Sequence, residues 1–135
     1  MGSSPQRLAV TPNGAFAYVT NFGSNDVSVI SAASNMVVAT VTVGLGPNDI
    51  AITPNGAFAY VANSVGNSVS VINTATDMVT ATIPLAAPRR VAITPSGAFA
   101  YVTTSTGVTV IDTATNLPAT RIRNTQVMLG LLFAY

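Results

Sequence analysis

Residues 10–21 read VTPNGAFAYVTN, and this stretch decides the fold because it returns twice further along the chain. Residues 52–63 read ITPNGAFAYVAN and residues 93–104 read ITPSGAFAYVTT, at offsets of 42 and 41 residues. Ten of the twelve positions agree between the first two copies, and nine agree between the first and the third. A period of about 40 residues is typical of repeat architectures, so we expect three copies of one structural unit.

Each repeat contains four short runs that are rich in Val, Ile, Thr, Phe and Tyr, the composition and length of β-strands. In the second repeat the runs are 48–53, 57–62, 68–73 and 78–83. The first two are joined by Pro54-Asn55-Gly56, a tight-turn signal because Asn and Gly tolerate a positive φ. No segment keeps helical spacing of apolar residues. We therefore predict an all-β chain of three four-stranded antiparallel sheets.

In the second run of each repeat, large side chains alternate with small ones, so each sheet has a bulky face and a small face. The bulky face carries six aromatic residues that we predict to pack between sheets: Phe16, Tyr18, Phe58, Tyr60, Phe99 and Tyr101. The opposite face carries Ala and Val. The bulky face of one sheet can then fill against the small face of the next, and the tyrosine hydroxyls must find partners there.

Four antiparallel strands about every 41 residues favour β-propeller blades. A β-sandwich is the alternative, but it has no reason to repeat its sequence so closely. The segments 18–21, 60–63 and 101–104 (YVTN, YVAN, YVTT), with 68–83 (SVSVINTATDMVTATI), resemble the YVTN-type β-propeller repeats over about residues 5–123. The resemblance implies a propeller related to archaeal surface-layer and bacterial exported proteins, with the first run of each blade innermost and the fourth outermost. The turns depart from the family pattern, since Ala follows Gly where Lys or Arg is usual.

The chain divides into five parts on this basis: leader or added residues at 1–4, blade 1 at 5–46, blade 2 at 47–87, blade 3 at 88–123, and an apolar tail at 124–135. The tail is either the degenerate start of a fourth blade or a cover for a neighbouring sheet. Closed propellers use four to eight blades, so three blades form an open arc with apolar faces at both ends. Head-to-tail self-association would complete the arc as a six-bladed dimer or extend it as an open filament; otherwise the missing repeats belong to a longer protein.

The composition limits the function. Charged residues make up only 7% of the chain and the net charge is +1, which argues against a nucleic-acid surface. The chain has no His, Cys, Lys or Glu, so thiolate metal sites are excluded and the commonest general base is missing. We expect no enzymatic activity, no cofactor and no metal site. The start has no signal-peptide core, and the longest apolar stretch, 127–135, is too short to span a bilayer as a helix.

The candidate binding site is the rim of the central channel, where each repeat places a polar pair at the start of its innermost strand. We expect Arg7, Asp49, Arg89 and Arg90 to converge there and to bind a small anion or a peptide acid. The alternative is that they solvate strand ends and pair Arg with Asp. Two other polar groups have structural explanations. Turn residues Asp26, Asp77 and Asp112, with Asn35 and Asn116 at equivalent positions to Asp77, cap turns. Arg121 and Arg123 keep an outer strand from pairing with other chains.

The leading hypothesis is therefore a non-enzymatic structural or interaction module, secreted or at the cell surface, that works by assembling with itself. The second is a propeller that binds a ligand or a protein at the channel rim. A third, an enzyme acting on lactones or sugars, is compatible with the resemblance but not with the lack of His and Glu.

Overall fold

The computed structural model describes residues 1–123, and within them the chain is all-β with no helix. Blade 1 consists of β1 (Pro5–Val10), β2 (Phe16–Asn21), β3 (Asp26–Ser31) and β4 (Met36–Thr42). Blade 2 consists of β5 (Pro47–Ile52), β6 (Phe58–Asn63), β7 (Ser68–Asn73) and β8 (Met78–Pro84). Blade 3 consists of β9 (Arg90–Ile93), β10 (Phe99–Thr103), β11 (Gly107–Asp112) and β12 (Leu117–Arg123). Each blade is an antiparallel sheet with its strands in chain order, which confirms the predicted fold class.

The turn between the first two strands forms as its residues predict. Gly56 has a φ of 76°, a left-handed conformation that favours glycine, and its N–H donates to the Thr53 carbonyl at 2.8 Å. The side chain of Asn55 accepts a hydrogen bond from the Ala57 N–H at 3.0 Å, which closes the turn from the other side. Because this local chemistry sets where the hairpin begins, the predicted strands of blade 2 agree with β5–β8 to within one residue at each end.

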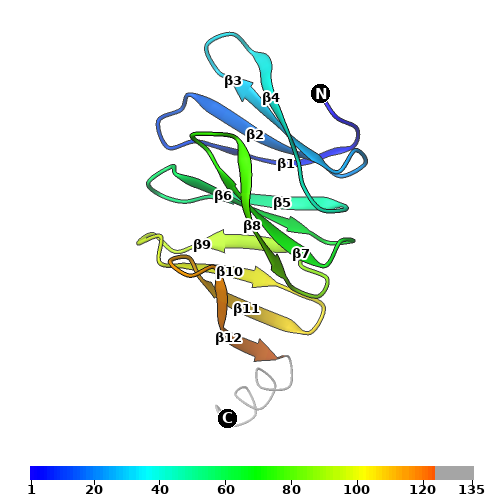
Figure 1. Ribbon diagram of the computed structural model, residues 1–135, viewed down its shortest axis with the longest axis vertical. Helices are drawn as coiled ribbons and strands as arrows, with labels where there is room; N and C mark the ends of the chain where they lie inside the picture. The colour runs from blue at the N-terminus through cyan, green and yellow to red at the C-terminus, as the bar shows by residue number, and fades with distance from the viewer. Residues whose placement is uncertain (124–135) are drawn as a thin grey trace, which may run out of the picture.

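The three blades stack on one another in chain order, as Figure 1 shows, with blade 1 (blue to cyan) at one end and blade 3 (yellow to orange) at the other. The first strands, β1, β5 and β9, approach one another closely, whereas the outermost strands β4 and β8 approach much less. The blades are therefore wedges that fan out from their inner strands. This is the geometry of an open arc of a propeller, and none of the sheets closes on itself.

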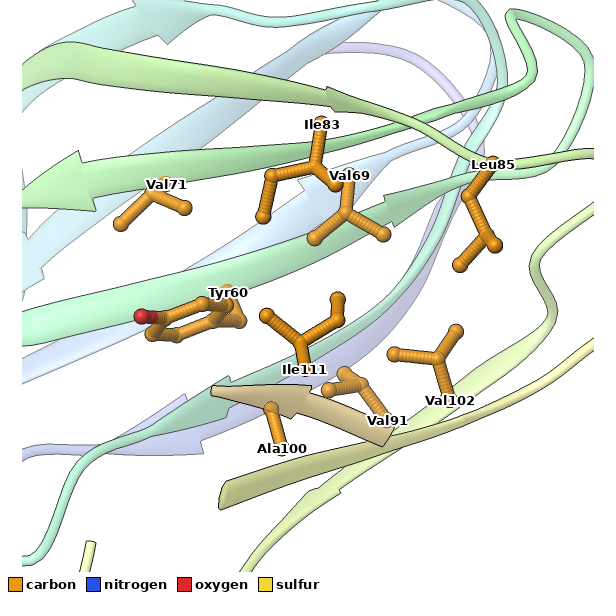
Figure 2. Packing of buried hydrophobic residues seen from close by; sticks show 9 residues of the cluster. All are labelled: Tyr60, Val69, Val71, Ile83, Leu85, Val91, Ala100, Val102 and Ile111. Carbon is orange, nitrogen blue, oxygen red and sulfur yellow. The ribbon is translucent and has the colours of Figure 1, made fainter. Parts of the chain in front are cut away.

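The core consists of two apolar layers, one at each junction between blades. At the first junction Tyr18 packs with Ala59 and Val61 of blade 2. At the second, Tyr60 packs with Ala100 and Val102 of blade 3, and Figure 2 shows these side chains together with Ile111 between the two sheets. A large side chain meets small ones in both layers, so the predicted packing of bulky face on small face is confirmed. The layers are continuous apolar surfaces, so the blades cohere through apolar packing.

The six predicted core aromatics differ in burial. Tyr18 and Tyr60 are each 1% exposed, and Phe58 is partly buried against the second layer. The core prediction is wrong for the other three, Phe16, Phe99 and Tyr101, which are exposed. Phe16 and Phe99 begin β2 and β10, beside the Pro-Asn-Gly or Pro-Ser-Gly turn, as Phe58 begins β6. All three lie at the end of their strand, where they are less covered than Tyr18 and Tyr60. Tyr101 is exposed because no described sheet packs on its face of blade 3.

Residues 1–4, predicted as a leader, take part in the repeat. The carbonyls of Ser3 and Ser4 accept hydrogen bonds from Gly23 and Phe22 at 3.0 and 2.9 Å. The linker before β5 makes the same pattern, where residues 45 and 46 accept from the N–H groups of residues 66 and 64. The start of the chain thus takes the place of an inter-blade linker. The predicted tail at 124–135 lies outside the described residues.

Candidate functional site

The two junctions between blades share one polar contact. The hydroxyl of Tyr18 donates a hydrogen bond of 2.6 Å to a carboxylate oxygen of Asp77 in blade 2. The hydroxyl of Tyr60 donates in the same way to the side-chain oxygen of Asn116 in blade 3. Asp77 and Asn116 occupy the same position of the turn between the third and fourth strands, with φ of 54° and 56°. Blades 1 and 2 therefore each contact the next blade through a tyrosine that donates a hydrogen bond to an Asp or Asn in a left-handed turn.

Sequence reasoning required a partner for each buried hydroxyl but did not identify it. It assigned Asp77 and Asn116 a role in their own turns only. The left-handed backbone agrees with that role, but their side chains serve the neighbouring blade. The sequence does contain a signal for this pairing, because both partners recur together. Every repeat has one tyrosine in its second run and one Asp or Asn before its fourth run.

The environment keeps these hydroxyls protonated. Burial raises the pKa of the Tyr18 phenol above its ordinary value of about 10, and the hydrogen bond to the negatively charged Asp77 raises this pKa further. Burial also raises the pKa of Tyr60, with a smaller contribution from the charge of Asp112. Both groups are consequently hydrogen-bond donors at neutral pH.

One end of the stack exposes a face of blade 3 that we call the forward face. It carries the residues equivalent to those that fill the two internal junctions, Tyr101, Val108, Val110 and Ile122. Of these, Tyr101 and Ile122 are exposed, Val108 is half-buried and Val110 is buried. Tyr101 is 43% exposed, whereas Tyr18 and Tyr60 are 1% exposed. Within residues 1–123 its hydroxyl has no hydrogen-bond partner. Within the part of the chain that the structure describes, the forward face is thus a junction surface on which no further blade lies.

The other end exposes the complementary face of blade 1, which we call the rear face. Its residues are equivalent to those on which blades 2 and 3 receive the preceding blade: Leu8, Ala17, Val19 and Ile30. Leu8 is exposed, Ala17 and Ile30 are half-buried and Val19 is buried. Leu8 is 62% exposed, whereas the equivalent Ile50 and Val91 are 5% and 7% exposed. Asn35 stands at the position of Asp77 and Asn116, with a φ of 56°, and its exposed side chain accepts no hydrogen bond within the described part of the chain.

The rear face is hollowed. A hollow of about 380 Å³ on blade 1 is lined by Pro5, Gln6, Arg7, Leu8 and Val19. A second hollow, of about 320 Å³, lies along β11 and β12 of blade 3 and is lined by residues that include Thr109, Arg121 and Ile122. Both are open depressions rather than enclosed cavities, and the one on the rear face suits a second sheet better than a small molecule.

The predicted rim residues lie at or beside the starts of β1, β5 and β9, at the same end of each inner strand. Asp49 accepts a hydrogen bond from the backbone N–H of Val91 at 3.0 Å, and Asn48 donates to the Arg89 carbonyl at 3.2 Å. Asp49 therefore binds the backbone of blade 3. Arg7, Arg89 and Arg90 are exposed, and a rim that binds an anion stays a prediction.

Residues 1–123 contain no group of three or more acidic or metal-binding side chains that could hold an ion. They also contain no helix of the length and apolarity needed to cross a bilayer.

Comparison with known proteins agrees with the fold. The sequence profile of a family described as "Lactonase, 7-bladed beta-propeller" matches residues 1–80. Among solved structures, hydrazine synthase of Kuenenia stuttgartiensis superposes with a TM-score of 0.86 at 29% identity, over 90% of this chain and 36% of that one. U3-55K superposes with a TM-score of 0.82 at 14% identity, over 92% of this chain and 40% of that one, which is a likeness of fold alone. The chain thus spans two fifths or less of these structures. No curated protein matches it.

Proposed function

The chain belongs to the Lactonase, 7-bladed β-propeller family, and on that premise we propose that its three blades are part of a propeller that a second copy of the chain extends. The protein is then a non-enzymatic structural or interaction module that assembles head-to-tail. The observation that carries the proposal is the equivalence of its two exposed faces to the faces that already meet inside the chain.

The forward face of one copy fits the rear face of another because the same pairing occurs twice within one chain. Tyrosine and valine from one blade pack on alanine, valine and isoleucine from the next at both internal junctions. A contact of this kind is heterologous, so it forms a ring where the rotation closes and a filament where it does not. The net charge of only +1 leaves little repulsion between copies to oppose it.

The gain from covering the end faces is appreciable. If Leu8 became as buried as the equivalent Ile50, more than half of its surface would leave water, which contributes about 1–2 kcal/mol. Tyr101, Val10 and Ile122 are also exposed on the end blades. Association costs each copy translational and rotational freedom. Burial of several such residues offsets that cost only if both junctions of a closed ring, or many junctions of a filament, form at once.

The non-enzymatic part of the proposal rests on composition. Hydrolysis of a lactone requires a general base or a metal-bound water, and the chain offers four Asp and no His or Glu for either task. The name of the family nevertheless favours a lactone-acting enzyme as the second candidate. Hydrolysis of simple lactones by the purified chain, abolished by changing one of its Asp residues, would support that candidate and contradict ours.

The exposed arginines at the rim favour one further role, the binding of an anionic ligand by the assembled ring. Arg7, Arg89 and Arg90 lie at the same end of the inner strands, and the one nearby carboxylate, on Asp49, is already engaged by the backbone of blade 3. We place such a module outside the cell or on its surface, as the related YVTN-type repeats suggest.

The test is the mass in solution. Multi-angle light scattering over a range of concentrations should give a species of twice 13.7 kDa or larger. Leu8→Asp places a charge on the rear face and should shift the population to monomer. Leu45→Asp is the matched control, since Leu45 is similarly exposed but lies in the linker between blades 1 and 2, away from both end faces. A wild-type chain that stays monomeric at 100 µM (on the order of the concentrations at which weak interfaces associate) refutes the proposal.

A further inference from the structure

We propose that the contact between copies is specified by a third tyrosine–asparagine hydrogen bond, in which Tyr101 of one copy donates to the side-chain oxygen of Asn35 in the next. This inference rests on the proposed function and deepens it, because it names the residues that set the register of one copy on another.

The donor is already in place. Tyr101 pairs with Ala92 on one side and Val110 on the other. Tyr60 pairs in the same way with Ala51 and Val71, as Tyr18 does with Ala9 and Val29. Since the sheet register is identical, Tyr101 projects from the forward face of blade 3 as its two counterparts project into the junctions they fill.

The acceptor is also in place. The backbone N–H of Asn35 donates to the Ser31 carbonyl at 2.7 Å, which holds the turn in its left-handed form. Asp77 and Asn116 make the equivalent bonds to residues 73 and 112 at 2.8 and 2.7 Å. The turn that receives a tyrosine at each internal junction is therefore formed in blade 1 before any tyrosine arrives, and no ordering of the backbone is needed on binding.

The surface between donor and acceptor has the required shape. Ala17 and Val19 on the rear face correspond to Ala59 and Val61, the small side chains on which the ring of Tyr18 rests. A phenol buried on that face without an acceptor would lose its hydrogen bond to water, which costs more than the bond itself contributes. Any register that does not bring Tyr101 to Asn35 is disfavoured for this reason, so the bond selects one arrangement among several apolar contacts.

The experiment measures the association constant between copies by sedimentation velocity over a concentration series. Tyr101→Phe removes the hydroxyl and should weaken association about 2- to 10-fold per junction. Asn35→Gly keeps the left-handed turn, removes the acceptor and should have a similar effect, and the double variant should be no weaker than either single one. Asn35→Asp keeps an acceptor, in the form that Asp77 already takes, so association should be at least as tight as in the wild type.

Tyr60→Phe is the matched control, because it removes the same hydroxyl at an internal junction. It should lower the unfolding temperature and leave the association of the folded chains unchanged. If the chain assembles but Tyr101→Phe and Asn35→Gly leave the association constant unaltered, the inference is wrong while the proposed function stands. If the wild-type chain is monomeric, both are wrong. Should Tyr101→Phe fail to fold, Asn35→Gly and Asn35→Asp alone decide the outcome.

Discussion

Replacing Tyr18 by Phe isolates the contribution of one inter-blade hydrogen bond to stability. The ring is 1% exposed and fills the layer between blades 1 and 2, so Phe keeps the packing and loses only the hydroxyl. The lost bond is the one to the Asp77 carboxylate at 2.6 Å. A hydrogen bond to a charged group contributes about 1.5–3 kcal/mol, whereas one between neutral groups contributes about 0.5–1.5 kcal/mol.

The second junction provides the comparison, because Tyr60 donates to the neutral Asn116. We expect Tyr18→Phe to lower the free energy of unfolding by about 2 kcal/mol and Tyr60→Phe by about 1 kcal/mol. Asp77→Asn gives the first junction the acceptor of the second. In that background Tyr18→Phe should cost only about 1 kcal/mol, so the double-mutant cycle should report a coupling of about 1 kcal/mol.

The assay is urea-induced unfolding followed by far-ultraviolet circular dichroism. All variants must be compared at one protein concentration, because assembly of the folded chain raises its apparent stability. The reasoning fails if Tyr18→Phe is within about 0.3 kcal/mol of the wild type, or if it costs the same amount with Asp and with Asn at position 77. The first result would mean that the junctions are held by apolar packing alone, and the second would mean that the charge of Asp77 adds nothing to the bond.

Three further predictions concern pH, a glycine at the start of β11, and salt. The two buried tyrosines have folded-state pKa values above their unfolded value of about 10. The stability that they contribute is therefore fully present below pH 10 and is lost as the pH rises from there toward the folded-state pKa values. In thermal melts the unfolding temperature should fall between pH 8 and pH 11, and it should fall less in the variant with both tyrosines replaced by Phe. Gly107 has a φ of 154°, and a Cβ added there would collide with the backbone carbonyl oxygen of Ile122. Gly107→Ala should therefore cost at least about 2 kcal/mol in urea unfolding, and a neutral result would contradict the described β11–β12 pairing. Arg90 stands in blade 3 at the position that Asp49 has in blade 2, so in the proposed assembly it approaches the start of β1 and Arg7 of the next copy. Because salt screens the repulsion between these two arginines, association should tighten about two- to threefold between 50 and 500 mM salt. Weaker association at high salt would argue for attraction between the copies instead.

The repeat, the four strands of each blade and the turn at Pro54-Asn55-Gly56 could be predicted without the structure. These features depend on interactions within about ten residues: alternation along a strand, a positive φ at Gly56, and Asn55 binding the next N–H but one. Stacking of bulky on small faces could also be predicted, because the alternation of Phe and Tyr with Ala recurs in every repeat.

The polar contacts between blades were decided by the tertiary structure. Tyr18 meets Asp77 across 59 residues and Asp49 meets the Val91 N–H across 42, because one wedge settles on the next at a particular height and rotation. Alternation along a strand specifies which face a side chain occupies, but it does not specify which turn of the neighbouring sheet lies opposite. For the same reason the pattern predicted six equivalent core aromatics, although burial at Tyr101 requires a further blade to lie against it. Local periodicity thus determines the fold of one blade. Only the stacking of blades determines which of the equivalent tyrosines are buried with a hydrogen-bond partner and which stay exposed.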